Sequence, residues 1–594
     1  MSSLTGKLSG ILGRAFEKCG FDGQYGKVIR SNRPDLCQFQ CNGAMAAARA
    51  CAGKLVQKAP GEVAREIIAA VEERWIFQDI SVAGPGFINI TLTDDFLADY
   101  IQDLGTKEKA GVEAPFRPLK IIVDYGGANI AKPLHVGHLR SAIIGECLKR
   151  LGRFLGHEVI GDIHLGDWGL QMGMIISELE RRRPDLPYFN PDYDGPYPKE
   201  APFSIADLET IYPEVSKRAK EDGQILEAAR QATFELQKGR PGYLALWRHI
   251  YNISVADLKA DYHKLNIDFD LWLGESSTRE TAPAMVERLK EQGYVKESQG
   301  ALVIPVARPE DQKEIPPLIL VKSDGAILYG TTDLATIEQR MRDFAPDVIL
   351  YVVDKRQGDH FLQVFRGAYL TQICPETVSL EHIGFGTMNG VDGRPFKTRD
   401  GGVMKLKDLI GMITGKAMER VQSSELGRDF DADQKAGIAR MIGVATLKYA
   451  DLMNHRLKDY VFDLERFSAF EGCTGPYLLY VAVRIKSILN KAKERGFAWG
   501  RIQPPGSAEE RDLFLRITEF ADIAVRTFED RAPNYLCDYV YQLAVAFNHF
   551  YHEHHILAEK DPKVQASWLN LSRIVLRILE LTLDILGIEV PERM

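Results

Sequence analysis

Two histidines at the start of a predicted helix are the residues best suited to chemistry. His135 and His138 lie in the sequence NIAKPLHVGHLR, and their spacing of three places both rings on one helix face. The free N–H groups and the positive dipole end of a helix N-terminus attract phosphate. Gly137 leaves the backbone open to a flat base or ribose, and Lys132 adds a mobile cation before the first turn. These residues predict activation of a nucleotide at its α-phosphate.

The neighbouring segments predict the fold that positions these histidines. The sequence LKIIVDY (residues 119–125) has apolar residues on both faces, which is typical of a central parallel strand. Two glycines end it, a helical pattern runs from residue 134 to about 155, and HEVIGDI (residues 157–163) predicts the next strand, completing a βαβ unit. The alternative is that both histidines merely begin a helix. Their position after a strand and a glycine turn favours the nucleotide site.

Length and composition limit the class of protein. With 594 residues the chain is too long for one core, which suggests roughly three to five domains. The net charge of −8 argues against unspecific coating of a polyanion, but it does not exclude an RNA partner bound by local basic patches. No window reaches the ~18 apolar residues of a membrane span, and the N-terminus lacks a continuous apolar core. We therefore expect a cytoplasmic protein without a membrane segment or secretory signal.

Cysteine and histidine spacing does not predict a metal site. The eight cysteines are scattered, and Cys37 and Cys41 form a C-x3-C pair without a second pair at zinc-like spacing. The run His552-Glu553-His554-His555 lacks the H-E-x-x-H spacing that places two imidazoles on one helix face. We predict reduced structural thiols, a polar helix surface at that run and no bound zinc.

The remaining patterns divide the chain into parts. Residues 1 to about 110 alternate helical stretches with strand signals such as GFINITL (residues 86–92), and a polar linker follows at 105–117. Residues from about 178 to 275 are charged and helix-rich, which predicts an insertion between the halves of a nucleotide-binding fold. From about residue 455 the pattern is almost wholly helical, which predicts a separate helical domain.

Three further strand signals lie beyond the predicted insertion. They fall at residues 301–306, 318–321 and 348–353, and we expect them to complete a second α/β half.

Several motifs resemble one family. HVGH is similar to the HIGH signature of class I aminoacyl-tRNA synthetases, and NIAKPLHVGHLRSAIIG resembles the arginyl-tRNA synthetase family closely. Further matches follow in chain order and span nearly the whole chain, namely GHEVIGDIHLGDWGLQMG, YGTTDLATIEQR, YVVDKRQGDHFLQVF, HIGFGTMNGVDGRPFKTRDGG, KYADL, EGCTGPYLLYVAVRIKSI and the ending LGIEVPERM.

The resemblance implies an α/β plus all-α protein. Residues 1–112 would form an N-terminal α+β domain that binds tRNA. Residues 113–455 would form a Rossmann-type catalytic domain containing the insertion at about 178–275, and residues 456–594 a helical anticodon-binding domain. The family expectation is a monomer.

The predicted arginine site begins with Tyr329 and Asp333. Their spacing of four allows them to share a helix face, where the carboxylate could take a guanidinium in a forked pair. The alternative is that Asp333 only caps its helix. The resemblance assigns it to the arginine side chain and implies further arginine contacts at Asp124, Gly127, Ala128, Asn129, His138 and Gln357. Many relatives have Ser-x-Pro-Asn where this chain has Gly126-Gly127-Ala128-Asn129, so a hydroxyl ligand is missing.

The resemblance also implies an ATP site that uses Mg2+ with ATP. Its predicted contacts are His135, Gly137, His138, Gly384, Phe385, Gly386 and Met388, where the backbone could approach adenine and Phe385 could stack on it. The KMSKS loop of class I enzymes matches Phe396-Lys397-Thr398-Arg399, which lacks the usual second lysine. Lys397 and Arg399 are predicted catalytic cations, and Lys132 is expected to supply the missing charge.

Five residues are predicted to contact tRNA(Arg). Phe87 and Asn89 are two apart on a predicted strand and so share a face, where the family reads a splayed D-loop base. Tyr480 and Arg484 share a helix face that offers an aromatic plane and a guanidinium to anticodon bases. Met594 matches a family position near the anticodon. Without the resemblance, a buried phenylalanine and an ordinary polar helix surface are the favoured interpretations.

The function implied is arginine–tRNA ligation with ATP, in which tRNA is needed for activation. A shorter nucleotidyltransferase with an H-x-G-H helix is one alternative, but it would lack the long helical domain. A non-catalytic synthetase-like protein would be expected to lack His135, His138 or Asp333, which are all present. Tyr329, Asp333 and Gln357 together argue against a synthetase for another amino acid.

Overall fold

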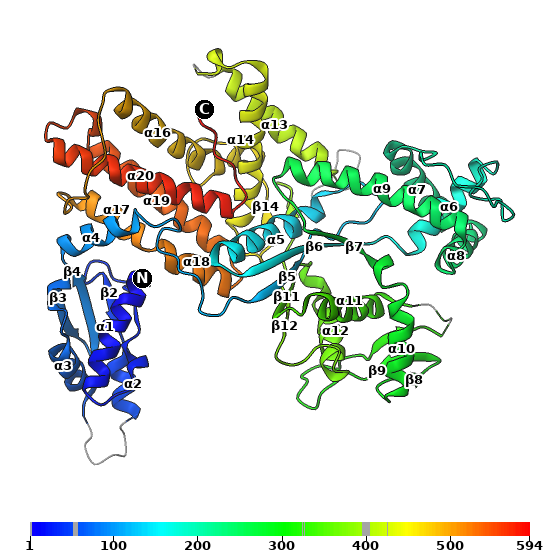
Figure 1. Ribbon diagram of the computed structural model, residues 1–594, viewed down its shortest axis with the longest axis horizontal. Coiled ribbons are helices and arrows are strands. Elements are labelled where there is room, and N and C mark those ends of the chain that lie inside the picture. The colour runs from blue at the N-terminus through cyan, green and yellow to red at the C-terminus, as the bar shows by residue number, and fades with distance from the viewer. Residues whose placement is uncertain (1–2, 51–57, 324, 326, 395–403, 424–425) are drawn as a thin grey trace.

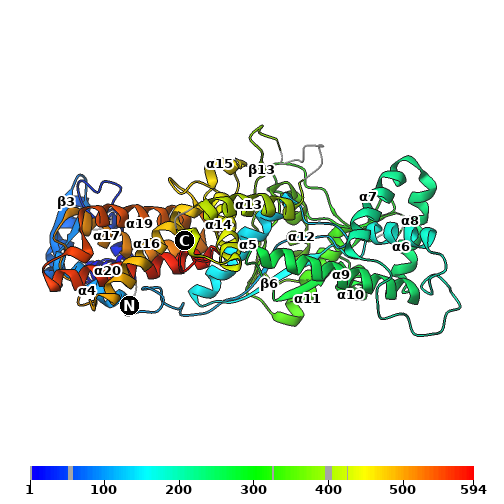
Figure 2. The ribbon, with the colours of Figure 1, turned by 90° about the horizontal axis from the view of Figure 1, so that it is seen from above.

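The computed structural model describes residues 3–50, 58–323, 325, 327–394, 404–423 and 426–594. The nucleotide-binding domain lies in the middle of an elongated molecule, with the helical insertion at one end and the N-terminal and helical C-terminal domains toward the other (Figures 1 and 2). Within the described residues, no helix is both long and apolar enough to cross a membrane.

The N-terminal domain packs helices on an antiparallel sheet of strand order β1-β2-β4-β3. The predicted strand at residues 86–92 is confirmed as β4, in which Ile88 and Ile90 are fully buried. The elements are α1 (Leu4–Lys18), β1 (Val28–Arg30), β2 (Phe39–Cys41), α2 (Gly43–Ala50), α3 (Pro60–Ala70), β3 (Phe77–Ala83), β4 (Phe87–Leu92) and α4 (Asp94–Leu104).

The nucleotide-binding domain contains a five-stranded parallel sheet of order β12-β11-β5-β6-β7. The central position of β5 and the βαβ unit of β5, α5 and β6 confirm the predictions. Ile121, Ile122 and Val123 are fully buried because helices and loops cover both faces of this strand. The elements are β5 (Lys120–Asp124), α5 (Val136–Leu155), β6 (Glu158–Leu165), β7 (Leu271–Gly274), α11 (Tyr329–Phe344), β11 (Val348–Tyr351), α12 (Gly358–Leu370) and β12 (Ser379–His382).

Two of the predicted strands belong to a different sheet. The signals at residues 301–306 and 318–321 form β9 (Ala301–Ile304) and β10 (Leu318–Val321), which pair antiparallel with each other. With β8 (Lys296–Ser298) they make a separate three-stranded sheet, so the prediction that they complete the second α/β half is wrong. This small sheet and α10 (Thr281–Glu291) share a core with Ile349 of the parallel sheet.

The insertion leaves the sheet after β6 and returns at β7. Its helices α6, α7 and α8 pack against one another, and α9 leads back toward the sheet (Figure 1). Ser204 caps α7 by accepting a hydrogen bond from the Asp207 N–H, which fixes where this helix begins. The helices are α6 (Leu170–Arg182), α7 (Ile205–Glu221), α8 (Gly223–Gln237) and α9 (Pro241–Lys264).

The C-terminal part is helical apart from the short parallel pair β13 (Met388–Asn389) and β14 (Tyr460–Val461). The signature helix α5 packs against α14, α18 and α20, so this bundle supports the helix that begins after the two-glycine turn. The helices are α13 (Leu406–Ser423), α14 (Ala432–Leu452), α15 (Leu464–Phe467), α16 (Gly475–Glu494), α17 (Ala508–Thr518), α18 (Phe520–Glu529), α19 (Asn534–Glu553) and α20 (Pro562–Ile585).

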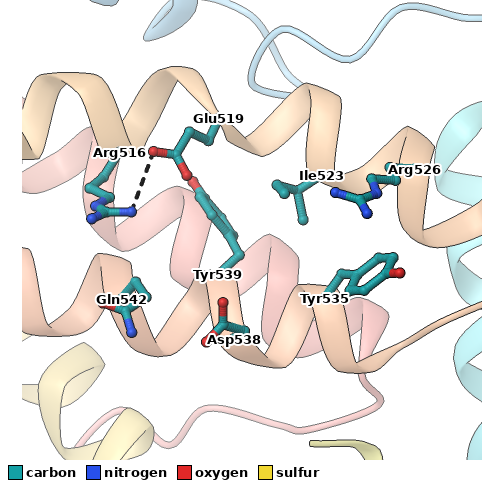
Figure 3. A pocket seen from close by; sticks show the side chains of 8 residues that line it. All are labelled: Arg516, Glu519, Ile523, Arg526, Tyr535, Asp538, Tyr539 and Gln542. Carbon is teal, nitrogen blue, oxygen red and sulfur yellow. Dashed lines mark ion pairs between the residues drawn. The ribbon is translucent and has the colours of Figure 1, made fainter. Parts of the chain in front are cut away.

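The N-terminal domain docks on the helical domain through polar contacts. Thr5 donates a hydrogen bond to Asp522 at 2.7 Å, and Arg511 donates to the Leu92 carbonyl at 2.7 Å. A cavity of about 140 Å³ lies close to this junction, lined by α17, α18 and α19 (Figure 3). Arg516 and Arg526 line it together with Glu519 and Asp538, so its charges balance and it has no excess positive charge to attract phosphate.

Candidate active site

The turn after β5 is built by two glycines in the left-handed region. Gly126 and Gly127 have φ of +91° and +42°, a conformation that strains residues with a side chain. The Gly126 N–H donates to Ser141 Oγ at 2.9 Å, and that hydroxyl donates to the Val352 carbonyl at 2.6 Å. A Cβ on Gly126 would lie 2.8 Å from the Phe269 ring. The turn therefore brings the ends of β5 and β11 and the start of α5 together.

The two signature histidines form one unit. His135 is the N-cap of α5, and its Nδ1 accepts the Gly137 N–H at 3.0 Å. The His138 Nδ1 accepts the His135 N–H at 3.2 Å, and the ring centroids are 3.9 Å apart. Because each Nδ1 is an acceptor, the proton of each neutral ring lies on Nε2, from which it can be donated to a ligand.

The charge state of this pair follows from its burial. Burial lowers the pKa of His135, and the nearby Lys132 lowers it further. Burial also lowers the pKa of His138 to about 3, with a further contribution from His135. The pair is therefore neutral near pH 7, and it provides hydrogen-bond donors rather than positive charge.

Of the three cations predicted to bind the triphosphate, the structure describes Lys132. The Lys132 Nζ lies 4.4 Å from the centroid of the Tyr212 ring on α7, so Lys132 contacts the insertion. Lys397 and Arg399 lie outside the described residues. The chain that follows them pairs with the entry to α5, because the Leu406 N–H donates to the Leu134 carbonyl at 2.8 Å.

Three carboxylates, those of Asp167, Glu275 and Asp333, lie near one another at the start of α11 and form an acidic site. Tyr329 is 69% exposed, and Asp333 one turn later pairs through Oδ2 with His360 Nε2 at 2.6 Å. Burial, together with the neighbouring Asp167 and Asp333 carboxylates, raises the pKa of Glu275 to about 8. Within the described part of the chain, no lysine or arginine forms an ion pair with any of these three carboxylates. A guanidinium would supply the missing positive charge.

Glu275 is a candidate binding residue that sequence reasoning missed. It directly follows β7, at the carboxyl edge of the parallel sheet where ligands bind in such folds. The next residue, Ser276, donates through its N–H and its hydroxyl to the Asp167 carboxylate at 2.9 and 2.6 Å. The sequence could have indicated this residue, because a carboxylate directly follows the short apolar run LWLG. The predicted boundary of the insertion at about residue 275 fell at the same place, so the run was not interpreted as a strand.

The predicted contacts for the α-amino and carboxylate end of arginine lie at the end of β5. The Asp124 Oδ2 accepts from Arg340 at 2.6 Å, and the same guanidinium nitrogen donates to Asp162 at 2.5 Å. Asp124 is therefore shared with a buried arginine, which the sequence did not indicate. Asn129 lies across Gly166, where an added Cβ would be 2.1 Å from the Asn129 Oδ1.

The remaining predicted arginine contacts are Gly127 and Ala128, which differ in exposure, and Gln357, which directly precedes α12. Ala128 is buried and bonds through its carbonyl to the Gly166 N–H at 3.0 Å, whereas Gly127 is exposed. Gln357 is exposed just before α12, and its N–H donates to the Asp354 carbonyl at 3.0 Å.

The segment predicted for adenine is buried at residues 384–386, and protein covers both its backbone and its aromatic ring. Phe385 is only 5% exposed, and its centroid lies 6.0 Å from the Arg140 guanidinium carbon. The expectation that its ring could stack on adenine is therefore not supported. The Gly384 carbonyl accepts from Arg456 at 2.9 Å, a Cβ on Gly386 would clash with the Lys458 backbone, and the Met388 side chain is buried.

The predicted tRNA contacts fall on two separate domains. Asn89 is 8% exposed beside the half-buried Phe87, and its Oδ1 accepts from Gln40 on β2 at 2.9 Å. Tyr480 is 41% exposed, and the Arg484 guanidinium lies 4.5 Å from its ring centroid. The C-terminal Met594 packs partly buried against the main core.

Comparison with known proteins covers the three domains. Residues 5–92 match the arginyl tRNA synthetase N terminal domain, 101–464 the class I (R) tRNA synthetase catalytic domain, and 478–594 the DALR anticodon binding domain. The arginine–tRNA ligases of Alkaliphilus oremlandii and Agathobacter rectalis are 53% and 49% identical to this chain, each over 100% of both chains.

Solved structures agree with these matches. The arginyl-tRNA synthetase of Plasmodium falciparum superposes with a TM-score of 0.80 at 25% identity, over 100% of both chains. The arginyl-tRNA synthetase of Thermus thermophilus shares the fold with a TM-score of 0.80 at 22% identity, also over 100% of both chains. With matches along its whole length, the chain belongs to the arginyl-tRNA synthetase family of class I aminoacyl-tRNA ligases.

Proposed function

We propose that this chain attaches L-arginine to tRNA(Arg) in two steps. The arginine carboxylate attacks the α-phosphate of Mg-ATP, giving arginyl-adenylate and pyrophosphate. The terminal ribose 2′-OH of tRNA then attacks the acyl carbon, which breaks the acyl–phosphate bond and releases AMP. The observation that carries the substrate assignment is the acidic site of Asp333 and Glu275. No lysine or arginine of the described residues neutralises these carboxylates, and they lie on the same sheet edge as the histidine pair. No nucleophilic side chain is needed, so catalysis is positioning and charge stabilisation.

Arginine would lie with its guanidinium in the acidic site. Asp333 takes the forked pair, Glu275 supplies a second negative charge, and Tyr329 covers the side chain. The α-amino and carboxylate end would then reach the turn after β5, where Asp124, Gly127, Ala128, Asn129, His138 and Gln357 are the proposed contacts.

ATP would lie along the start of α5. The Nε2–H groups of His135 and His138 donate to the phosphates, the exposed Gly137 leaves the helix start open to ribose, and adenine would lie on the side of the 384–388 segment. Lys132 provides positive charge together with Lys397 and Arg399. Mg2+ would enter with the triphosphate, and the residues described contain no cluster of three or more His, Cys, Asp or Glu side chains that could hold a metal ion.

Activation that depends on tRNA has a physical route through the packing of α5. Arg150 on α5 pairs with Asp584 on α20 at 3.0 Å. Buried Lys448 on α14 donates to the Gly587 carbonyl at 3.0 Å and to the Asn266 carbonyl at 3.2 Å. A tRNA held by Tyr480, Arg484 and Met594 would bind α16, which packs on α14 and α20, and these two helices contact the signature helix. Phe87 and Asn89 would bind its D-loop, and we propose a cytoplasmic monomer.

The direct test is ATP–pyrophosphate exchange with each of the twenty amino acids, with and without tRNA. We expect exchange with arginine only, and only when tRNA(Arg) is present. Exchange with another amino acid would overturn the substrate, and arginine exchange without tRNA would overturn the tRNA requirement.

Arginine binding should strengthen as the pH rises toward 8. Glu275 has a pKa of about 8 in the free enzyme, so it is mostly protonated at pH 7 and must lose its proton to face a guanidinium. The dissociation constant should therefore rise by up to about tenfold for each pH unit below 8. Calorimetry in buffers of different ionisation enthalpy would measure the proton released. In Glu275→Gln both the proton release and this pH dependence should disappear; their persistence would contradict the assignment.

A further inference from the structure

Helix α7 of the insertion faces the nucleotide site with two polar side chains. Glu209 and Tyr212 are three residues apart, so they lie on one face of the helix. The adjoining face of the helix is anchored by the buried side chains of Leu208, Ile211 and Val215. The helix thus presents a carboxylate and an aromatic ring to the nucleotide-binding domain from a fixed support.

Tyr212 contacts the residue that precedes the signature histidines. The Lys132 ammonium lies 4.4 Å from its ring centroid, within the range of a cation–π contact. Tyr212 is also close to the arginine site: burial raises the pKa of Tyr329, and the nearby Glu275 and Tyr212 raise it further. Tyr212 therefore contacts the proposed phosphate cation and lies near Tyr329 of the proposed guanidinium site.

Glu209 holds the chain that pairs with the entry to α5. It forms ion pairs with Lys405 at 2.8 Å and Lys407 at 3.2 Å, and its side chain is only 14% exposed. Lys405 in turn pairs through its backbone with His135. Pro213 has no N–H to bond to the Glu209 carbonyl, so α7 lacks one internal hydrogen bond beside these two residues.

We propose that α7 positions the cations of the activation step, with Tyr212 holding Lys132 through its ring face and Glu209 holding the 404–407 segment against His135. A lysine side chain loses rotamer entropy when it is fixed, and the ring restricts it before ATP arrives. Tyr212 and Glu209 are positioning residues. The inference rests on the proposed role of Lys132 as the phosphate cation.

The test compares Tyr212→Leu with Tyr212→Phe in tRNA-dependent ATP–pyrophosphate exchange. Leucine removes the ring, so we expect kcat to fall about 3- to 30-fold, the range of a cation–π contact, while KM for arginine stays within about twofold. Phenylalanine keeps the ring face and should restore nearly the normal rate. Thermal unfolding of both variants separates this effect from a loss of folding.

A double-variant cycle with Lys132→Ala completes the test. If the ring acts through Lys132, Tyr212→Leu should cause no further loss when Lys132 is already alanine. The inference would be overturned if Tyr212→Leu caused an equal loss with and without Lys132→Ala, or if Tyr212→Leu alone had a normal or raised rate. It would also be overturned if Tyr212→Phe were as defective as Tyr212→Leu. None of these results would affect the proposed function. A normal rate for Lys132→Ala would overturn the inference and the proposed role of Lys132, whereas the proposed ligase function would stand.

Discussion

Replacing Asp333 with asparagine should lower kcat/KM for arginine by about two to three orders of magnitude. Removing one partner of a hydrogen-bonded charge pair costs about 2–5 kcal/mol, because the other charge is left unpaired in the site. Asparagine keeps the shape of the side chain and can still accept from His360, so the fold should be preserved. Steady-state aminoacylation with varied arginine would measure the change, which should appear mainly in KM for arginine and not in KM for ATP.

Asp343→Asn is the matched control for this variant. Asp343 lies near the end of the same helix and pairs with its exposed neighbour Arg342 at 2.8 Å, so its replacement should leave the kinetics unchanged. Equal behaviour of the two variants would show that Asp333 only pairs with His360, since α11 begins at Tyr329 and Asp333 is not its cap. Such a result would remove the main support for arginine as the substrate.

The part of the site that lies on continuous chain could be predicted. The glycine turn, His135 and His138 all lie between β5 and α5, so the apolar strand and the helical pattern were enough to bring them together. The structure adds which nitrogen of each ring carries the proton. That depends on N–H groups of the helix start and not on spacing.

The contacts between distant segments could not be predicted in this way. Arg340 lies 216 residues from Asp124, and the contact between them arises from the register of β5 against β11 and the packing of α11. Lys132 and Tyr212 are brought together by the direction in which the insertion leaves the sheet. No local pattern near either residue carries that information.

The incorrectly placed strands show a related limit. LILV in β10 and VILY in β11 are equally apolar in sequence, yet all four residues of β11 are buried while Ile319 of β10 is 40% exposed. A strand's hydrophobicity indicates that it is partly buried, whereas its partner strands depend on the connections. The chain after β7 forms α10 and a hairpin before it returns to the parallel sheet, which only the structure shows.

Replacing Lys132 with alanine should slow tRNA-dependent ATP–pyrophosphate exchange by about 100- to 1,000-fold. This is the cost of removing one preorganised donor from a site where negative charge develops, here the five-coordinate α-phosphate and the departing pyrophosphate. Because Lys132 lies against the Tyr212 ring and not in the core, thermal unfolding should be little changed. The loss should appear in kcat, since the charge stabilises the transition state more than bound ATP.

Lys120→Ala provides the comparison, because Lys120 begins β5 at the opposite edge of the sheet and pairs with the exposed Glu158 at 3.4 Å. It removes the same charge from the same strand–helix unit and should leave exchange unaffected. Lys132→Arg should recover only part of the rate, since a planar guanidinium does not reproduce a compact ammonium at the phosphates. Near-normal exchange in Lys132→Ala would mean that Lys397 and Arg399 supply all the charge needed, and that the lysine before the signature helix has no part in activation.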